Sequence, residues 1–476
     1  MKRKFLHDIS ANTLQVIINQ VCGLGIFYVL SAFLDKNDFG EINWALAVLL
    51  TLFGILAFGI DQVFVRRIAS GHNRQENLSI YISHVLLSGL LMYGLLFAGK
   101  FIFPGFFKQH YLLLLLGIGK LMIFFSTPFK QLATGMEEFR PLLLMSVCSN
   151  VVRSIALLIF AFLHPFNLTV IVIIFIAGDL LELLVCILLA GGSLSVPVRL
   201  AWRKQAYAGL LTESLPQLGV SIFTSLISRF DWIFLGLFTT NIILANYSFA
   251  YKIFEMATLP MLVIAPILIP RFTRLFHPSA GETPQEKIND LIVLFRIEMV
   301  IASLTALVLN ILWIPVIDHI TAGKYGAVNH YNILLLSASM PFLYLNNFLW
   351  TINFAKGHLK MIFYVFAITF GVNVMADTGL IPFFKAEGAA AGYLVAIIAQ
   401  SVAYLWQTRF PRFIKNSYTL LLCPACAFAA GFVATKICHG TFPALTVALL
   451  LFSLMLVMSR QLRISDWQVL RRVTGL

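Results

Sequence analysis

Charged residues are scarce in this chain of 476 residues: they make up 12% of the sequence, against 59% hydrophobic residues. A soluble domain carries about 25% charged residues, which it needs to cover its surface. The mean hydropathy of +0.88 is correspondingly high. This composition excludes a soluble enzyme, a secreted domain, a fibrous protein and a disordered chain. The sequence therefore predicts a protein that is embedded in lipid.

Motifs that carry chemistry are also missing. The chain has no G-x-x-x-x-G-K-[ST] sequence, which excludes a P-loop ATPase, and no defensible pairing of a nucleophile with a base. Cys423 and Cys426 have a C-x-x-C spacing, but they lie inside an apolar run without a second pair, which favours inert thiols. The ten histidines show no metal-ligand spacing. We therefore expect no catalytic centre, no metal and no bound cofactor, so that the protein is not an enzyme.

Long apolar runs are abundant, and each is close to the roughly 20 residues that a helix needs to span a bilayer. The sequence predicts an all-α polytopic membrane protein with about fourteen transmembrane helices. The expected spans are 11–34, 42–65, 78–99, 111–133, 141–163, 167–190, 207–238, 242–270, 288–317, 330–354, 360–384, 387–409, 418–438 and 441–459.

The basic residues set the orientation. Lys and Arg number 34 and Asp and Glu 21, and the net charge of +13 would suggest nucleic acid in a soluble protein. Here the bases lie in small clusters between apolar runs. If the N-terminus is inside, 23 of the 34 fall in cytoplasmic segments and six on the opposite side. This asymmetry predicts cytoplasmic termini and an uncleaved first helix, and it excludes a nucleic-acid partner.

Two halves are indicated by the basic, non-apolar stretch 193–205, which separates six spans from six more. The expected organisation is an N-terminal tail at 1–10, a first lobe at 11–190, a linker at 191–206, a second lobe at 207–410, two further spans at 411–459 and a C-terminal tail at 460–476. Parallel repeats of this kind are common in transporters, which place their substrate site between the repeats.

Several charges lie deep within the expected spans, where each costs at least ~2.5–3.5 kcal/mol on insertion scales. They are Lys120, Arg153, Asp179 and Glu182 in the first half, and Arg229, Asp231, Lys252, Glu255 and Asp377 in the second. Other charges fall nearer the cytoplasmic interface, where a charge costs little: Asp61, Glu213, Arg296 and Glu298. The deep charges either pair between helices or line a wet cavity, and the sequence leaves both readings open.

Polar residues recur on single helix faces. Asn12, Gln15 and Asn19 share one face of the first span, and Gln217, Ser221, Thr224, Ser228 and Asp231 share one face of the seventh. Such stripes line a cavity or join helices by hydrogen bonds. Proline is concentrated in the seventh and eighth spans, which indicates either a hinge or a static kink. The prolines are Pro216, Pro260, Pro266 and Pro270.

The order of several short motifs resembles polysaccharide-export flippases of the Wzx type. In the first half these are the helix from Asn12 to Gly25, then Asp38-Phe39-Gly40, Phe58-Gly59-Ile60 and Arg66-Arg67-Ile68-Ala69. In the second half they are Arg229-Phe230-Asp231, Leu235-Gly236, Asn246-Tyr247-Ser248-Phe249-Ala250-Tyr251-Lys252 and Ile269-Pro270-Arg271-Phe272. The resemblance covers roughly the first twelve spans.

This resemblance implies the fold of the MOP exporter superfamily, with two pseudo-symmetric six-helix lobes in a V around a central cavity. It implies a flippase in the bacterial inner membrane that moves an undecaprenyl-pyrophosphate-linked oligosaccharide to the outer leaflet by alternating access, as in O-antigen and lipopolysaccharide synthesis. Polysaccharide polymerase and assembly proteins are expected partners. Fourteen spans also occur in the lipid II flippase branch, in which the additional pair forms a groove proposed for the lipid tail; the spans at 411–459 would correspond to it.

The expected site follows from the chemistry of a pyrophosphate and a sugar. Arginine binds phosphate bidentately and lysine binds it as a point charge, so the expected phosphate contacts are Arg153, Arg229, Lys252 and Lys120. The expected sugar contacts are Asn12, Asn19, Gln217, Tyr247 and Tyr251. Four acids are expected near these cations: Asp179, Glu182, Asp231 and Glu255. They either pair with the cations or couple transport to H⁺ or Na⁺.

Two alternatives stay open. A multidrug or cation antiporter of the same fold would favour an acidic, aromatic-lined cavity over a mixed or basic one. A membrane-embedded transferase or a scaffold in polysaccharide assembly is the other.

Overall fold

The computed structural model describes residues 2–163, 167–197, 203–227, 229–261, 284–408, 418–463 and 466. Within these residues the chain is helical and contains no strand. The expected all-α class is confirmed. Two compact units are formed, of which the first holds residues 1–236 and 240–245 and the second holds 237–239 and 246–476.

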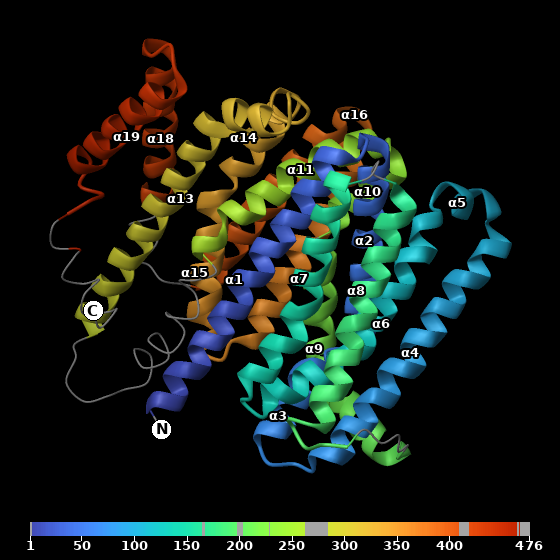
Figure 1. The fold of residues 1–476 in the computed structure, drawn as a ribbon. Helices are drawn as coiled ribbons and strands as arrows, with labels where there is room; N and C mark the ends of the chain where they lie inside the picture. The colour runs from blue at the N-terminus through green and yellow to red at the C-terminus, as the bar shows by residue number, and fades with distance from the viewer. Residues whose placement is uncertain are drawn as a thin grey trace. The chain divides into compact units, whose positions relative to one another are not determined.

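The first unit begins with six long or paired segments that follow the expected spans. They are α1 (Lys2–Phe33), α2 (Lys36–Leu56) with α3 (Ile60–Ala69), α4 (Arg74–Ile102), α6 (Tyr111–Gly135), α7 (Phe139–Leu163) and α8 (Leu168–Gly191). The short helix α5 (Pro104–Gln109) joins α4 to α6. Within this unit α1 packs on α7, and α6 packs on α2, α3, α4 and α8 (Figure 1). These contacts make α6 the central helix of the unit.

The expected single span 42–65 is broken in the structure between α2 and α3. Phe58 and Gly59 both have a left-handed backbone, with φ of 55° and 67°. A Cβ atom on Gly59 would lie 2.8 Å from the backbone of Gln217, so the close approach of α9 (Lys204–Ile227) also requires glycine here. The break is therefore built into the packing of α3 on α9.

The first compact unit also contains α9, most of α10 (Phe230–Phe238) and the start of α11 (Asn241–Ala257). The sequence analysis instead assigned all of residues 207–410 to the second lobe. The reason for this difference is the contact of α9 with α2 and α3. Helix α9 bends by 60° between Lys204–Leu215 and Gln217–Ile227, on either side of Pro216. This bend agrees with the expected effect of proline, whereas Pro266 and Pro270 lie outside the described residues.

The second unit is built around α13 (Pro284–Ile320). This helix packs on α14 (His330–Ala338), α15 (Met340–Ala355), α18 (Tyr418–Ile437) and α19 (Thr441–Met458). The 3₁₀ turn Ala327–Asn329 leads into α14, and α16 (Leu359–Thr408) packs on α14 and α15. Helices α18 and α19 lie side by side and are the expected thirteenth and fourteenth spans (Figure 1).

Eleven helices of the described residues are long and apolar enough to cross a membrane, or twelve if the bent pair in α9 is one span. Three local features explain why eleven spanning helices are found where fourteen spans were expected. Helix α16 contains a non-helical residue, Lys385, where φ is 52° and ψ is −124°, so this one element holds two expected spans. Helix α9 is bent, and α11 has only 17 residues before the chain enters 262–283, outside the described residues. The protein is therefore a multi-pass membrane protein, as expected.

Candidate functional site

Three helices of the first unit bring buried charges together. Arg153 of α7 lies with its guanidinium 2.8 Å from one carboxylate oxygen of Asp179 on α8, and Lys120 of α6 lies 3.5 Å from the other oxygen. Arg153 and Asp179 are only 7% and 2% exposed. The three residues predicted from the sequence to lie deep in separate spans are thus neighbours in one buried ion cluster.

Glu182 extends this cluster by one helical turn of α8. It accepts contacts from the ammonium of Lys130 and the hydroxyl of Ser149, and it lies 3.7 Å from Arg153. Ser149 in turn accepts a hydrogen bond of 3.2 Å from the Arg153 guanidinium. The spacing of Asp179 and Glu182, three residues apart on one face, allows one arginine to reach both acids. We call these residues, with Lys120, the α6–α8 ion cluster.

Small residues leave room for the cluster where the helices meet. A Cβ atom on Gly178 would lie 2.6 Å from Cγ and 2.7 Å from Nε of Arg153. A Cβ atom on Gly119 would overlap the carboxylate of Asp179. Glycine at both positions therefore lets α6, α7 and α8 approach closely enough for the side chains to pair.

The cluster contains three basic and two acidic side chains. The 2.8 Å contact between Arg153 and Asp179 is an ion pair without hydrogen-bond geometry, because Arg153 Nε and Asp179 Oδ1 have no hydrogen-bond partner. Pairing of buried charges offsets their desolvation only in part. Asp179 and Glu182 are therefore paired with cations, which is one of the two arrangements that the sequence left open.

Arg229 and Asp231 lie at the start of α10. The Arg229 guanidinium carbon lies 4.8 Å from the centre of the Trp232 ring, a cation–π geometry. Asp231 is buried, and its carboxylate accepts a hydrogen bond of 2.9 Å from the backbone N–H of Trp232. Both residues belong to the first unit.

Lys252 and Glu255 pair on α11 in the second unit. Their polar atoms are 2.8 Å apart, and the side chains are 24% and 41% exposed. On the same helix Tyr247 and Tyr251 are buried, with ring centres 5.9 Å apart, and Tyr251 also packs edge-on against Tyr393 of α16. Lys252 is therefore more accessible than Arg153 and Lys120, which are 7% and 13% exposed, whereas the two tyrosine rings pack inside the unit.

The expected sugar contacts of the first unit lie on α1 and α9. The amide of Asn150 on α7 donates a hydrogen bond of 2.9 Å to the Asn19 side chain, so this part of the polar stripe joins α1 to α7. Gln217 is half-buried in α9. Asn12 lies in α1, with its side chain outside the described residues. Whether these side chains meet a substrate stays a prediction.

Sequence reasoning missed a second buried acid–base pair, Glu41 with His110. The ring of His110 lies 3.1 Å from the Glu41 carboxylate and stacks on Trp44 at 4.0 Å between ring centres. Asn241, the first residue of α11, donates a hydrogen bond of 3.1 Å to the same carboxylate. Glu41 directly follows the Asp38-Phe39-Gly40 sequence quoted for the resemblance, but no pattern there predicts a histidine partner 69 residues away.

The motif Arg66-Arg67 has a definite role in the fold. Both arginines contact Glu213 of α9, with Arg67 Nε 2.8 Å from the carboxylate, and Arg67 also donates a hydrogen bond of 3.2 Å to Asn77 of α4. These contacts join α3, α4 and α9. Asp61 accepts a hydrogen bond from the Tyr81 hydroxyl. Asp61 and Glu213, two of the acids expected near the cytoplasmic interface, are therefore both partnered.

A cavity of about 470 Å³ lies between α13, α14 and α18 in the second unit. Its walls are mainly apolar and include Leu307, Leu334 and Phe432, and a polar edge is formed by Asn310 and Ser337. Asn310 donates a hydrogen bond of 2.7 Å to the Ser337 hydroxyl. We call this space the α18 cavity.

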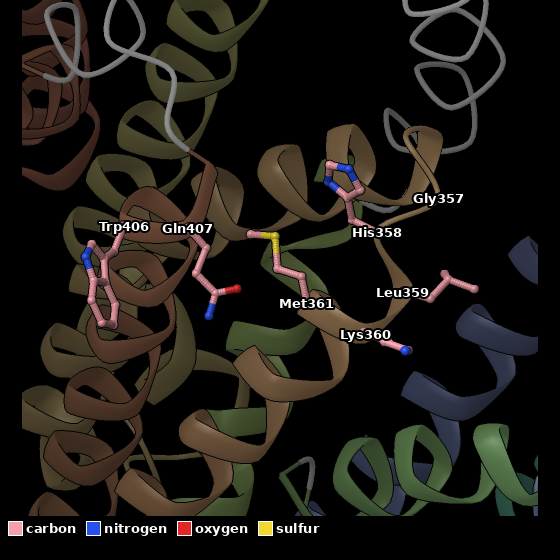
Figure 2. A pocket seen from close by; sticks show the side chains of 7 residues that line it. All are labelled: Gly357, His358, Leu359, Lys360, Met361, Trp406 and Gln407. Carbon is pink, nitrogen blue, oxygen red and sulfur yellow. The ribbon is translucent and has the colours of Figure 1, made fainter.

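A wider cavity of about 1010 Å³ lies where α15 leads into α16 and where α16 ends. Figure 2 shows His358 and Lys360 on one side of it and Gln407 on the other, with Trp406 pointing away. Lys360 belongs to a segment that positive-inside counting assigns to the cytoplasm. The lining carries cationic and amide groups but no acidic residue.

Within the described residues no group of three His, Cys, Asp or Glu side chains could hold a metal ion. Cys423 and Cys426 on α18 are free thiols, Cys423 fully buried and Cys426 half-buried. The first unit thus holds paired buried charges, and the second unit holds a largely apolar cavity.

Three solved structures are similar to this chain over most of its length. The lipid II flippase MurJ, in an inward closed conformation, has a TM-score of 0.74 and 14% identity, and the match covers 94% of this chain and 98% of that one. An inward-facing MATE multidrug resistance transporter has a TM-score of 0.65 and 14% identity, with coverage of 86% and 99%. A MOP superfamily transporter from Pyrococcus furiosus has a TM-score of 0.59 and 14% identity, with coverage of 87% and 95%.

These likenesses show the fold, which is that of the MOP superfamily, as the resemblance predicted. No curated protein matches the sequence. The model of a protein family described as "polysaccharide biosynthesis protein" matches residues 5–276, which is more than half of the chain. The match confirms the resemblance to polysaccharide-export flippases, and the chain belongs to the polysaccharide biosynthesis protein family.

Proposed function

We propose that this protein is a flippase that moves an undecaprenyl-pyrophosphate-linked oligosaccharide from the cytoplasmic to the outer leaflet of a bacterial inner membrane. It does so by alternating access, with both termini in the cytoplasm. The membership in a polysaccharide biosynthesis family and the flippase and transporter fold support transport of a lipid-linked glycan. The polymerase and assembly proteins that act on the same glycan are proposed partners.

The observation that carries this proposal is the α18 cavity. An oligosaccharide on a polyprenyl carrier needs an apolar surface for its tail as well as polar contacts for its head group. Helices α18 and α19 add such a surface, because α18 closes the apolar cavity against α13 and α14. The matched share of this chain is 94% with the lipid II flippase and 86% with the MATE transporter, in keeping with a lipid-carrying function.

The head group is proposed to contact cations that the structure shows in ion pairs. Arg153 is paired with Asp179 and Lys252 with Glu255. A pyrophosphate can replace a carboxylate at such a cation, because charge-assisted contacts to phosphate are strong and arginine makes them bidentately. Exchange of partner on binding would let the acids hold the cations in place while the site is empty. Arg229 and Lys120 are the further proposed phosphate contacts.

The test is transport by the purified full chain in proteoliposomes. The probe is a fluorescent disaccharide on undecaprenyl pyrophosphate, and its arrival on the outer leaflet is measured by a membrane-impermeant quencher. The variants are Lys252→Ala and the double variant Arg153→Gln with Asp179→Asn, which removes both charges without leaving a buried ion unpaired. Lys100→Ala, on the exposed end of α4, is the matched control.

We expect both test variants to transport at least about tenfold more slowly than the wild type, which corresponds to the loss of ~1.4 kcal/mol of substrate interaction. The control should match the wild type. Wild-type rates in both test variants, at equal protein levels, would remove these cations from the proposal. Export of an organic cation by a wild-type protein that does not move the lipid-linked probe would establish the multidrug alternative instead.

A further inference from the structure

Glu298 on α13 is buried in the second unit in an unusual way. Its side chain is 3% exposed, and neither of its carboxylate oxygens has a hydrogen-bond partner. Other buried acids of the described residues have at least one oxygen in contact with a partner: Asp179 with Arg153, Glu182 with Lys130, Asp466 with Arg296, Glu41 with His110, and Asp377 with Asn373.

Among the described residues, no ion pair supplies Glu298 with a counter-charge. Arg296, two residues earlier on α13, is held by Asp466. The Tyr344 hydroxyl on α15 is the titratable group that interacts with Glu298. The helices that pack on α13 carry these further titratable groups among the described residues: His330 and Tyr331 on α14, and Tyr418, Cys423, Cys426 and Lys436 on α18. None of these forms an ion pair with Glu298.

The protonation state of Glu298 depends on the free energy of burying its ionised carboxylate. Burying a carboxylate without a counter-charge costs several kcal/mol, and a buried group usually avoids this cost by taking up a proton. A metal cation is a poor alternative, since hard cations need several oxygen ligands and, among the described residues, Glu298 belongs to no group of three His, Cys, Asp or Glu side chains that could hold one. The carboxyl group is therefore neutral in the conformation described.

We propose that Glu298 is a proton-binding site of the transporter: it holds one proton in this conformation and exchanges it with water in a conformation that exposes α13. The proton resides on a carboxyl oxygen and leaves to water as the carboxylate becomes hydrated. The exchange rests on the proposed function, because only a transport cycle alternates the exposure of the group. The bound proton itself does not depend on that function.

The bound proton is tested by infrared spectroscopy of the full chain in lipid nanodiscs. A protonated carboxyl group has a carbonyl stretching band, which shifts on exchange into heavy water. The substitution Glu298→Gln keeps the shape of the neutral acid, so the variant should fold. The matched control is Glu387→Gln, which makes the same change at an exposed glutamate of α16.

We expect one carbonyl band, present at neutral pH in the wild type and in the control, to be lost in Glu298→Gln. Identical carbonyl regions in the wild type and Glu298→Gln would show that Glu298 is ionised and would overturn the proposal. This readout needs no substrate, so it decides on the proton site even if the lipid-linked probe is not transported.

The exchange of the proton is tested in proteoliposomes with the probe of the transport assay. With one proton per substrate, a gradient of one pH unit shifts the distribution of the probe between leaflets by up to about tenfold, since one unit is worth ~1.4 kcal/mol per proton. We expect this shift in the wild type and in Glu387→Gln, and no shift in Glu298→Gln. A sodium gradient should shift none of the three.

Two outcomes would overturn the exchange: a pH-driven shift in Glu298→Gln equal to that of the wild type, or a sodium-driven shift in the wild type that Glu298→Gln loses. A wild-type protein that fails to move the probe, whichever gradient is applied, would instead count against the proposed function. The infrared result would still be valid.

Discussion

The pairing of Arg153 with Asp179 makes a strong prediction about stability. Arg153→Ala removes the cation that lies 2.8 Å from Asp179 and 3.7 Å from Glu182 in a cluster where both acids are at most 5% exposed. Removing one partner of a buried ion pair costs about 3–5 kcal/mol, because the remaining charge stays buried without compensation. Lys120 and Lys130 remain in contact with the acids, so we expect the lower end of this range.

This loss converts into a shift of the unfolding temperature. A unit of this size loses roughly 2 °C for each kcal/mol. Arg153→Ala should therefore unfold about 6 °C below the wild type when the melting of the purified full chain in nanodiscs is followed by intrinsic fluorescence. Arg153→Gln combined with Asp179→Asn keeps the shapes and removes both charges, and it should recover most of the difference, since a buried pair can be replaced by neutral groups at little cost.

The single variants Arg153→Gln and Asp179→Asn complete the double-mutant cycle with the double variant. Asp179→Asn alone leaves Arg153 facing Glu182, and its melting temperature should lie between those of the wild type and Arg153→Ala. The coupling between positions 153 and 179 should amount to at least about 1 kcal/mol. The reasoning would be refuted if Arg153→Ala melted at the same temperature as the wild type. It would also be refuted if the stability lost by the double variant equalled the sum of the losses of the two single variants.

Three further predictions concern packing, the α18 cavity and a surface ion pair. Gly236→Ala should lower the melting temperature by the equivalent of about 1–3 kcal/mol, because a Cβ atom there would overlap the Trp44 ring, whereas Gly94→Ala on α4 meets nothing within 4 Å and should be neutral or stabilising. Gly431→Leu narrows the α18 cavity and should slow transport of the lipid-linked probe several-fold, with the lipid-exposed Leu450→Phe on α19 as a control. Arg66→Ala should cost less than about 1 kcal/mol in a melting assay, since this arginine is mostly exposed and Arg67 still contacts Glu213.

The helices could be predicted from the sequence because a bilayer imposes a length and a composition on each span. Hydropathy therefore located α4, α6, α7, α8, α13, α18 and α19 to within a few residues, whereas α1 begins at Lys2, nine residues before the expected span 11–34. The breaks inside spans were harder, because each depends on a distant contact. The turn at Gly59 exists because the backbone of Gln217 passes beside it, and a window of local hydropathy does not contain Gln217.

For the charged residues too, the position along a helix could be predicted from the sequence, but some of the contacts could not. Counting along each helix predicted that Lys120, Arg153 and Asp179 lie deep in their spans, and the structure joins these three residues in one cluster. The count did not reveal Lys130 as the partner of Glu182, because Lys130 lies near the end of α6 and reaches inward with a long side chain. Side-chain reach is a property of the packed helices, so it could not be predicted from position in the sequence.

Glu298 shows why depth alone is an incomplete description of a charge in a membrane protein. Its position, ten residues from the start of the expected span 288–317, predicted a group near the interface, where a charge costs little, but its side chain is buried inside the protein. Depth measures distance along the helix axis, whereas the cost of a charge depends also on the face that the residue occupies. Glu298 occupies the buried side of α13, where no described cation pairs with it, while Arg296 reaches Asp466. Two neighbouring charges at nearly equal depth thus have different states: one is compensated by a partner and the other by a proton.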